Sequence, residues 1–334
     1  MDKLVTVIIP CYNAEKNIEA TIQSVLEQTI GPEKLHILLI NDGSSDGTQD
    51  KLEQLQTAHP EIVTVITQAN QGVAKTRTKG ISMTETAYLT FLDADDILEP
   101  YFLENLLSVA IEGDFDVVSS GIQRKKYSGE IVKEFKVKKP DTEWAKWILM
   151  SSCAKIHRTQ FLKEQNIHFL DSLFGEDAYF VLSEIIKGAK FKVLDYIGYT
   201  WMLNPESMTN TRYNGISEYN SNQIMIMLES MIDLGADWAD DDLFSYFILK
   251  QAVNRCLSPG KNATPEEFMR HYKRTIALLK GKYPKTLRNS LVFRGPEGEE
   301  QFVRYAIAMF VIIHRLKLMP LFSKIYCKGK ENTN

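Results

Sequence analysis

Short apolar runs and helical patterns alternate along the first 110 residues, and this alternation constrains the fold more than any other feature of the chain. The apolar runs are continuous and rich in β-branched residues, which suits strands that are buried on both faces. Each run precedes a segment whose apolar residues recur at helical spacing. The repeated pattern predicts a parallel, doubly wound α/β sheet. The predicted strands are residues 4–9, 35–40, 63–66 and 88–92.

A polar loop follows each predicted strand. Because the carboxyl ends of parallel strands meet at one edge of an open sheet, these loops would line the crevice in which α/β proteins bind ligands. The chain has no GxGxxG after the first strand and no GxxxxGK[ST] motif, which disfavours a dinucleotide dehydrogenase and a P-loop kinase. The loops are residues 10–13, 41–47, 70–72 and 93–96.

The fourth loop carries three carboxylates, on Asp93, Asp95 and Asp96. Charges at the end of a buried strand are costly to desolvate, and their mutual repulsion adds to that cost. A divalent cation offsets both effects, and Mg²⁺ and Mn²⁺ prefer oxygen ligands. The alternative is a solvated acidic turn that caps a helix from Glu99. The neighbouring polar loops favour a metal with bound phosphates.

A second acidic pair, Glu176 and Asp177, follows Gly175 and lies between aromatic residues at the start of a helical pattern. Acidic residues are favoured at a helix N-terminus by the helix dipole, which is the structural interpretation. Apolar flanks also raise the pKa of a carboxyl group toward that of a useful general base. A catalytic base is therefore the functional interpretation.

Residues 4 to about 205 resemble the family 2 glycosyltransferases, which have the GT-A fold. The resemblance is carried by five motifs in the order of the family, which together are far more specific than any one alone. The motifs are VIIPCYN at 7–13, NDGSSDGT at 41–48, NQG at 70–72 with Arg77, FLDADD at 91–96, and GED at 175–177.

The resemblance implies a set of nucleotide-binding residues. Pro10 and Tyr12 would flank the nucleobase, and Asp42 would accept its N3–H. Arg77 would lie near uracil or phosphate, and Asp93 would face the ribose. The full set implied to bind the nucleotide is Pro10, Tyr12, Asn13, Asp42, Asn70, Arg77, Asp93 and Ala94.

The resemblance also implies an inverting, metal-dependent transfer from a UDP-sugar. Asp95 would be the ligand of Mn²⁺ or Mg²⁺, which would stabilise the negative charge on the leaving diphosphate. Asp177 would be the general base toward the acceptor hydroxyl, and Glu176 would support it or bind the acceptor. The chain departs from the family's frequent Ala-Arg-Asn, with threonines on both sides of Arg77.

Some family members place a histidine metal ligand in a loop that closes over the nucleotide. The chain has no histidine between His168 and His271, so Asp95, the diphosphate and water alone would hold the metal. Ser207 and Arg212 are candidate phosphate contacts from this loop. Upstream, residues 141–150 are predicted to be helical, and they hold Trp144 and Trp147, which would pack in the core or stack on a sugar.

From about residue 217 the pattern becomes helical, so we predict a GT-A catalytic domain over 1–215 and a helical domain over 216–334. Residues 264–267 form a capping box with proline at the first helical position. Residues 302–330 combine an apolar run with basic residues. They form either a core helix with a solvated tail or a patch on an anionic membrane, which would suit a lipid-linked acceptor.

Bulk properties exclude several classes of protein. The net charge of −4 argues against a nucleic-acid binder, and four widely spaced cysteines suggest neither a disulfide framework nor a zinc site. No apolar run reaches the roughly 18 residues of a transmembrane helix. The three residues before the first strand are too few for a signal peptide, so we expect a cytoplasmic protein, or one at the cytoplasmic face of the membrane.

The predicted function is transfer of a hexose or N-acetylhexosamine to a hydroxyl acceptor in the synthesis of capsule, exopolysaccharide or teichoic acid. A sugar nucleotidyltransferase is one alternative, although its usual glycine-rich, basic first loop is missing. A non-catalytic nucleotide-binding partner of another transferase is the other, and the presence of both Asp95 and Asp177 argues against it. The sequence leaves open whether the chain forms a homo-oligomer.

Overall fold

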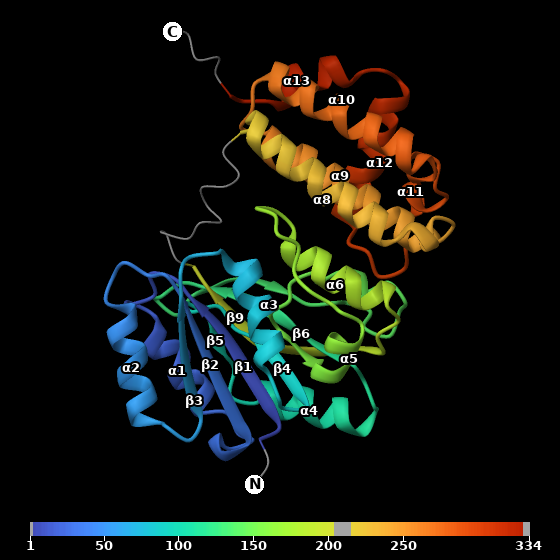
Figure 1. Ribbon diagram of the computed structural model, residues 1–334. Helices are drawn as coiled ribbons and strands as arrows, with labels where there is room; N and C mark the ends of the chain where they lie inside the picture. Colours follow the sequence, from blue (N-terminus) through green and yellow to red (C-terminus); the bar gives the residue numbers. More distant parts are fainter. Residues whose placement is uncertain (1–2, 204–214, 330–334) are drawn as a thin grey trace. The chain divides into compact units, whose positions relative to one another are not determined.

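The computed structural model describes residues 3–203 and 215–329, which form two compact units (Figure 1). The first unit contains residues 3–171 and 176–203, and the second contains 172–175 and 215–329. The predicted domain boundary near residue 215 borders 204–214, so its position stays a prediction. Ser207 and Arg212 also lie outside the described residues.

The first unit is built on one mixed sheet, which has nine strands among the described residues. Strands β1 to β4 are parallel to one another, as the alternating pattern predicts, whereas β8 pairs antiparallel with β4 and β6. The order is β3-β2-β1-β4-β8-β6-β9-β5, with β7 on β6. The strands are β1 (Val5–Cys11), β2 (Leu35–Asp42), β3 (Val63–Gln68), β4 (Tyr88–Phe91), β5 (Ile97–Leu98), β6 (Val117–Lys125), β7 (Ile131–Phe135), β8 (Lys155–Arg158) and β9 (Phe191–Met202).

Helices pack on this sheet where apolar residues recur at helical spacing. α3 lies against β1 and β2, and a Cβ atom at Gly80 would come within 2.5 Å of Ile8 Cγ2, so this helix needs glycine to approach the sheet. The helices of the unit are α1 (Ile18–Leu26), η1 (Pro32–Lys34), α2 (Thr48–Ala58), α3 (Val73–Met83), α4 (Phe102–Glu112), η2 (Ala145–Trp147), α5 (Thr159–Glu164) and α6 (Glu176–Ile186).

The predicted helix over 141–150 is wrong, because only the short 3₁₀ turn η2 forms there. Trp144 and Trp147 are both buried and stack with their ring centroids 6.0 Å apart. One 3₁₀ turn is enough to bring residues three apart onto the same side. The tryptophans therefore pack in the core, and the sugar-stacking alternative is wrong.

The second unit is helical in its described residues. The helical pattern predicted from about residue 217 is confirmed by α8, which buries apolar residues from Ile224 to Ile232, and the capping box at Thr264 and Glu267 begins α10, as predicted. No described helix is long and apolar enough to cross a membrane. The helices are α8 (Glu218–Leu234), η3 (Ala236–Trp238), α9 (Asp242–Gly260), α10 (Pro265–Lys282), η4 (Pro284–Leu287), α11 (Leu291–Arg294), α12 (Gln301–Arg315) and α13 (Met319–Tyr326).

Candidate active site

Asp42 lies at the carboxyl end of β2 and joins this strand to the loop before α3. Its buried carboxylate accepts hydrogen bonds from the backbone N–H groups of Gln71 and Gly72, at 2.9 and 2.8 Å. The side-chain Nε2 of Gln68 donates to the same carboxylate at 2.8 Å. Asp42 therefore fixes the predicted nucleotide loop in place, and its own contact with a nucleobase stays a prediction.

The loop after β1 is tied to the loop after β2. Asn13 has a positive φ of 50°, and its Oδ1 accepts from the backbone N–H of Ser45 at 2.9 Å. The Tyr12 side chain is 49% exposed, and Pro10 pairs with Ile40 in the parallel register. An exposed aromatic ring beside two linked loops suits the stacking of a flat base.

The acidic loop after β4 is anchored by Asp96. This buried carboxylate accepts from the Tyr199 hydroxyl at 2.6 Å and from the backbone N–H of Met202 at 2.9 Å, both on β9. Burial, together with the nearby charges of Asp93 and Asp95, raises the pKa of Asp96 well above its usual range. Asp96 therefore has a structural role, and it connects the acidic loop to the end of β9.

The rest of this loop is held by backbone contacts. The Thr21 hydroxyl of α1 donates to the carbonyl of Ala94 at 3.0 Å, and the N–H of Asp96 donates to the carbonyl of Asp93. Asp93 and Asp95 are half-buried at the tip. Their side chains lie at the sheet edge where ligands of α/β proteins bind.

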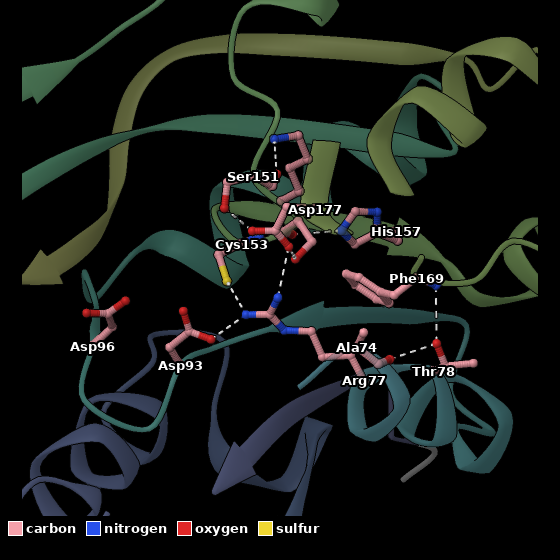
Figure 2. Close-up of polar contacts among 12 residues, drawn as sticks. Ala74, Arg77, Thr78, Asp93, Asp96, Ser151, Cys153, His157, Phe169 and Asp177 are labelled. Atoms are coloured by element: carbon pink, nitrogen blue, oxygen red, sulfur yellow. Dashed lines mark hydrogen bonds and ion pairs between the residues drawn. The ribbon is translucent and has the colours of Figure 1, made fainter. Parts of the chain in front are cut away.

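Arg77, on α3, lies between the two predicted acidic motifs (Figure 2). Its Nη1 donates to Asp177 Oδ1 at 2.8 Å, its Nη2 donates to Asp93, and only 4% of its side chain is exposed. Burial alone would lower the pKa of Arg77, but the two carboxylates outweigh it and raise that pKa well above the usual value. One buried cation thus brings together carboxylates that are 84 positions apart in the chain (177 − 93).

Asp177 lies in the first turn of α6, where Glu176 begins the helix. Its Oδ1 accepts two hydrogen bonds, one from Arg77 and one from the Ser152 hydroxyl at 2.6 Å. No partner of Oδ2 lies among the described residues, and the side chain is 29% exposed. The carboxylate is therefore fixed through one oxygen, and the other oxygen is left for a ligand.

Strand β8 holds Ser152 in position through His157. The His157 Nε2 contacts the carbonyl of Ser152 at 3.1 Å, and its Nδ1 contacts Glu184 Oε1 at 2.6 Å. A carbonyl oxygen only accepts, so Nε2 is the donor to Ser152, and Nδ1 faces the carboxylate of Glu184. Both side chains of this pair are completely buried.

Lys155, two residues before His157 on β8, holds the backbone just before Ser152. Its Nζ donates to the carbonyls of Leu149 and Ser151 at 2.8 and 2.6 Å. Burial lowers the pKa of Lys155 to about 8. Two buried side chains of one strand therefore fix the backbone from which Ser152 reaches Asp177.

The acidic loop can contribute a carboxylate to a divalent cation. Within residues 3–203 and 215–329, no group of three or more His, Cys, Asp or Glu side chains is arranged to hold a metal ion. Asp95, half-buried at the tip of this loop, is the ligand that the family resemblance names, and its role toward a metal stays a prediction. A single carboxylate fits a cation that takes its other ligands from a diphosphate and water.

A family model described as "Glycosyl transferase family 2" matches residues 6–175, which is half of the chain. The chain belongs to glycosyltransferase family 2. This match includes the first four motifs and ends at Gly175, just before the acidic pair of α6. The predicted family and enzyme class are confirmed.

Relatives of this family 2 glycosyltransferase include two named glycosyltransferases of Bacillus subtilis. An uncharacterized glycosyltransferase of Bacillus subtilis (strain 168), EpsJ, is 29% identical over 282 residues, covering 78% of this chain and 80% of EpsJ. TuaG, a putative teichuronic acid biosynthesis glycosyltransferase of the same strain, is 37% identical over 109 residues, covering 33% of this chain and 42% of TuaG.

Among solved structures, residues 1–349 of S. aureus TarS in complex with UDP-GlcNAc match the glycosyltransferase with a TM-score of 0.73. The sequence identity is 19%, and the match covers 98% of this chain and 93% of that chain. The likeness shows the fold. The prediction of a GT-A domain followed by a C-terminal helical region is therefore confirmed.

The residues that hold Asp177 and the acidic loop of the glycosyltransferase in place lie outside its five sequence motifs. Ser152, His157 and Glu184 belong to none of the five motifs, and each reaches its partner only through the fold. Tyr199, which binds Asp96, was missed for the same reason. A weak signal existed for β8, where the polar Lys155 and His157 alternate with apolar Ile156, as on one face of a strand.

The predicted ligand roles stay predictions, although the fold gathers most of the predicted residues at one sheet edge. The residues predicted to bind the nucleotide or metal from the strand-end loops and α3, together with Glu176 and Asp177, belong to the first unit. Arg77 contacts Asp93 and Asp177 directly, while Asn70 is exposed beside Gly43. Glu176 is half-buried next to Asp177. The roles of Pro10, Tyr12, Asn13, Asp42, Asn70, Ala94 and Asp95 toward nucleotide or metal also remain predictions.

Proposed function

We propose that the enzyme transfers a hexose or N-acetylhexosamine from a UDP-sugar to a hydroxyl acceptor, with inversion, in the synthesis of a cell-surface polysaccharide. The observation that carries the proposal is the convergence of the acidic loop and Asp177 on Arg77. The complex of TarS with UDP-GlcNAc and the name of TuaG support the donor and the pathway class.

In the proposed mechanism, Asp177 removes the proton of the acceptor hydroxyl. Oδ1 is occupied by Arg77 and Ser152, so the proton would move to Oδ2. The acceptor oxygen would attack the anomeric carbon from the side opposite the diphosphate, and this single displacement inverts that centre. A positioned general base typically contributes 10²–10⁴-fold to the rate.

The departing UDP develops negative charge at the acidic loop. Asp95 would hold Mn²⁺ or Mg²⁺ there, and when bound the cation supplies charge stabilisation to the diphosphate. Asp42 keeps the loop before α3 in place, and Tyr12 offers a ring to the base. These residues would orient the donor before the acceptor attacks.

The proposed acceptor is a glycan or a lipid-linked glycan. A lipid-linked acceptor requires the enzyme at a membrane surface, so we propose that it works at the cytoplasmic face of the membrane through residues 302–330. The net charge of −4 gives no support to a nucleic-acid partner.

Asp177→Asn tests the assignment of the base. We expect the variant to bind UDP with Mn²⁺ as the wild type does in isothermal titration, and to lose 10²–10⁴-fold in kcat for UDP release from UDP-sugars with acceptor. Asp195→Asn, at an exposed carboxylate paired with Lys136, is the matched control and should keep full activity. Full activity of Asp177→Asn would refute the base assignment.

A further inference from the structure

Helix α12 is apolar on two opposite faces. Its inner face buries Ile307, Phe310 and Val311, and the helix packs against α9, α11 and α13. Its outer face carries a stripe of large apolar side chains that are 43–81% exposed. These residues, hereafter the α12 stripe, are Phe302, Tyr305, Met309, Ile312 and Leu316.

The members of the α12 stripe are spaced by three and four residues, so they lie in one line along the helix. A helix that is apolar all round is ordinarily covered on all sides. Exposed Leu321 and Ile325 of α13 add to the apolar surface of this region. Exposed apolar surface of this extent indicates a contact with a protein or a membrane.

The charges around the α12 stripe identify the kind of partner. Residues 301–329 contain no Asp or Glu, although the whole chain has a net charge of −4. Their basic residues include Arg315, Lys317, Lys324 and Lys328, all of which are exposed. The segment therefore combines an apolar stripe with exposed cations and contains no acidic side chain itself; the nearest in the sequence is the exposed Glu300, at the N-cap of α12.

We infer that α12 and α13 bind the surface of a membrane that contains anionic lipids. α12 has 15 residues and is too short for a span, which needs about 20. It would lie in the plane of the interface, with the α12 stripe among the acyl chains and the cations at the headgroups. Phe302 and Tyr305 are of the residue types that favour this region.

A second copy of the chain fits this face less well than lipid does. In a two-fold contact the same patch lies on both subunits, so the cations of one copy would face those of the other. Like charges at an interface disfavour the contact. The inference deepens the membrane-face part of the proposed function and rests on it, but it stands apart from the sugar chemistry, because none of these residues belongs to the proposed active site.

The test uses the full chain and vesicles of phosphatidylcholine with or without phosphatidylglycerol. We expect flotation of the wild type with the anionic vesicles only, weakening as salt is raised. The stripe variant F302S/M309S/L316S and the charge variant K317Q/K324Q/K328Q should each bind at least about tenfold more weakly. The control Y219S/I226S, which removes exposed apolar residues of α8, should bind as the wild type does.

Two further measurements separate the outcomes. Thermal unfolding checks that each variant is folded, and UDP release from a soluble donor should be unchanged in all of them, so failure of this inference is distinguishable from failure of the proposed chemistry. Equal vesicle binding by wild type and stripe variant would overturn the inference. So would a wild-type dimer that is lost in the stripe variant and binds no vesicles, since the stripe would then be a protein interface.

Discussion

At the scale of single residues, the orientation of Asp177 depends on two donors to one oxygen. Arg77 is charged and Ser152 is neutral, and both reach Oδ1. Ser152 is itself buried and has its carbonyl held by His157. We therefore regard Ser152 as a positioning residue, because it acts on the acceptor only through Asp177.

Ser152→Ala should lower kcat by about 10-fold, since a hydrogen bond to a charged group contributes roughly 1.5–3 kcal/mol and Arg77 still holds the carboxylate. The KM for the donor should stay nearly constant, because no donor-binding residue is changed. Steady-state kinetics with varied UDP-sugar measure both constants.

Ser152→Thr should restore most of the rate, because it keeps the hydroxyl. Ser183→Ala, which removes a buried hydroxyl that contacts only the α6 backbone, serves as the control. A kcat of Ser152→Ala equal to that of the wild type would show that Arg77 alone positions the base.

At the scale of elements, the sequence predicted the strands and helices that bury a continuous or periodic apolar surface. β1 to β4 and the helices between them follow from local pattern, and so do the polar loops at the strand ends. The antiparallel β8 was missed because its four residues include a buried lysine and a buried histidine. Polar residues that are satisfied only by distant partners leave at most a weak alternation over so short a strand.

The same distinction, between local sequence patterns and contacts made by distant residues, applies to the candidate active site. Asp42, Asp93, Asp95 and Asp177 stand in recognisable motifs, so the sequence could nominate them. Ser152 is 25 positions before Asp177, and nothing local connects the two. Arg77 was assigned to the nucleotide by resemblance, whereas its partners in the protein required the packing of α3 against the sheet.

A buried histidine of α10 that contacts α8 predicts that the folded protein loses stability in acid. His271 of α10 contacts the Ser221 hydroxyl of α8 at 2.8 Å. Burial, with a further effect of Arg274, lowers the pKa of His271 to about 4. The unfolded chain takes up a proton at this residue below about pH 6.5 and the folded chain does not, so stability falls as the pH falls from 6.5 to 4.

Between pH 7 and 4.5 we expect a loss of about 2–3 kcal/mol in the free energy of unfolding from this residue. His271→Asn keeps a polar acceptor but does not titrate in this range. The variant should therefore lose about 2–3 kcal/mol less free energy of unfolding than the wild type between these two pH values. Urea unfolding followed by helical circular dichroism at both pH values measures it. His168→Asn, at an exposed histidine, is the control, and equal pH dependence of wild type and His271→Asn would contradict the prediction.

At the scale of the whole molecule, folding and metal binding should be separable. The described residues offer no group of three or more His, Cys, Asp or Glu side chains that could hold a metal ion. We expect chelation with EDTA to abolish sugar transfer and to leave the thermal unfolding midpoint within about 1 °C, because only the donor complex would use the cation.

Adding Mn²⁺ or Mg²⁺ back should restore transfer, and Asp95→Asn should need a higher concentration of the metal for half of its maximal activity. Asp46→Asn, at a carboxylate in the second polar loop, should respond to metal as the wild type does. Full activity in the presence of excess EDTA would argue against a metal-dependent mechanism.

The turn at 149–152 has a consequence for engineering the enzyme. Three of its four carbonyl groups are fixed by side chains of β8: those of Leu149 and Ser151 by Lys155, and that of Ser152 by His157. Inserting or deleting one residue there would leave the buried Lys155 Nζ without its carbonyl acceptors. It would also move the Ser152 hydroxyl out of reach of the Asp177 carboxylate. Libraries meant to broaden acceptor range should therefore leave the length of this turn untouched and diversify elsewhere.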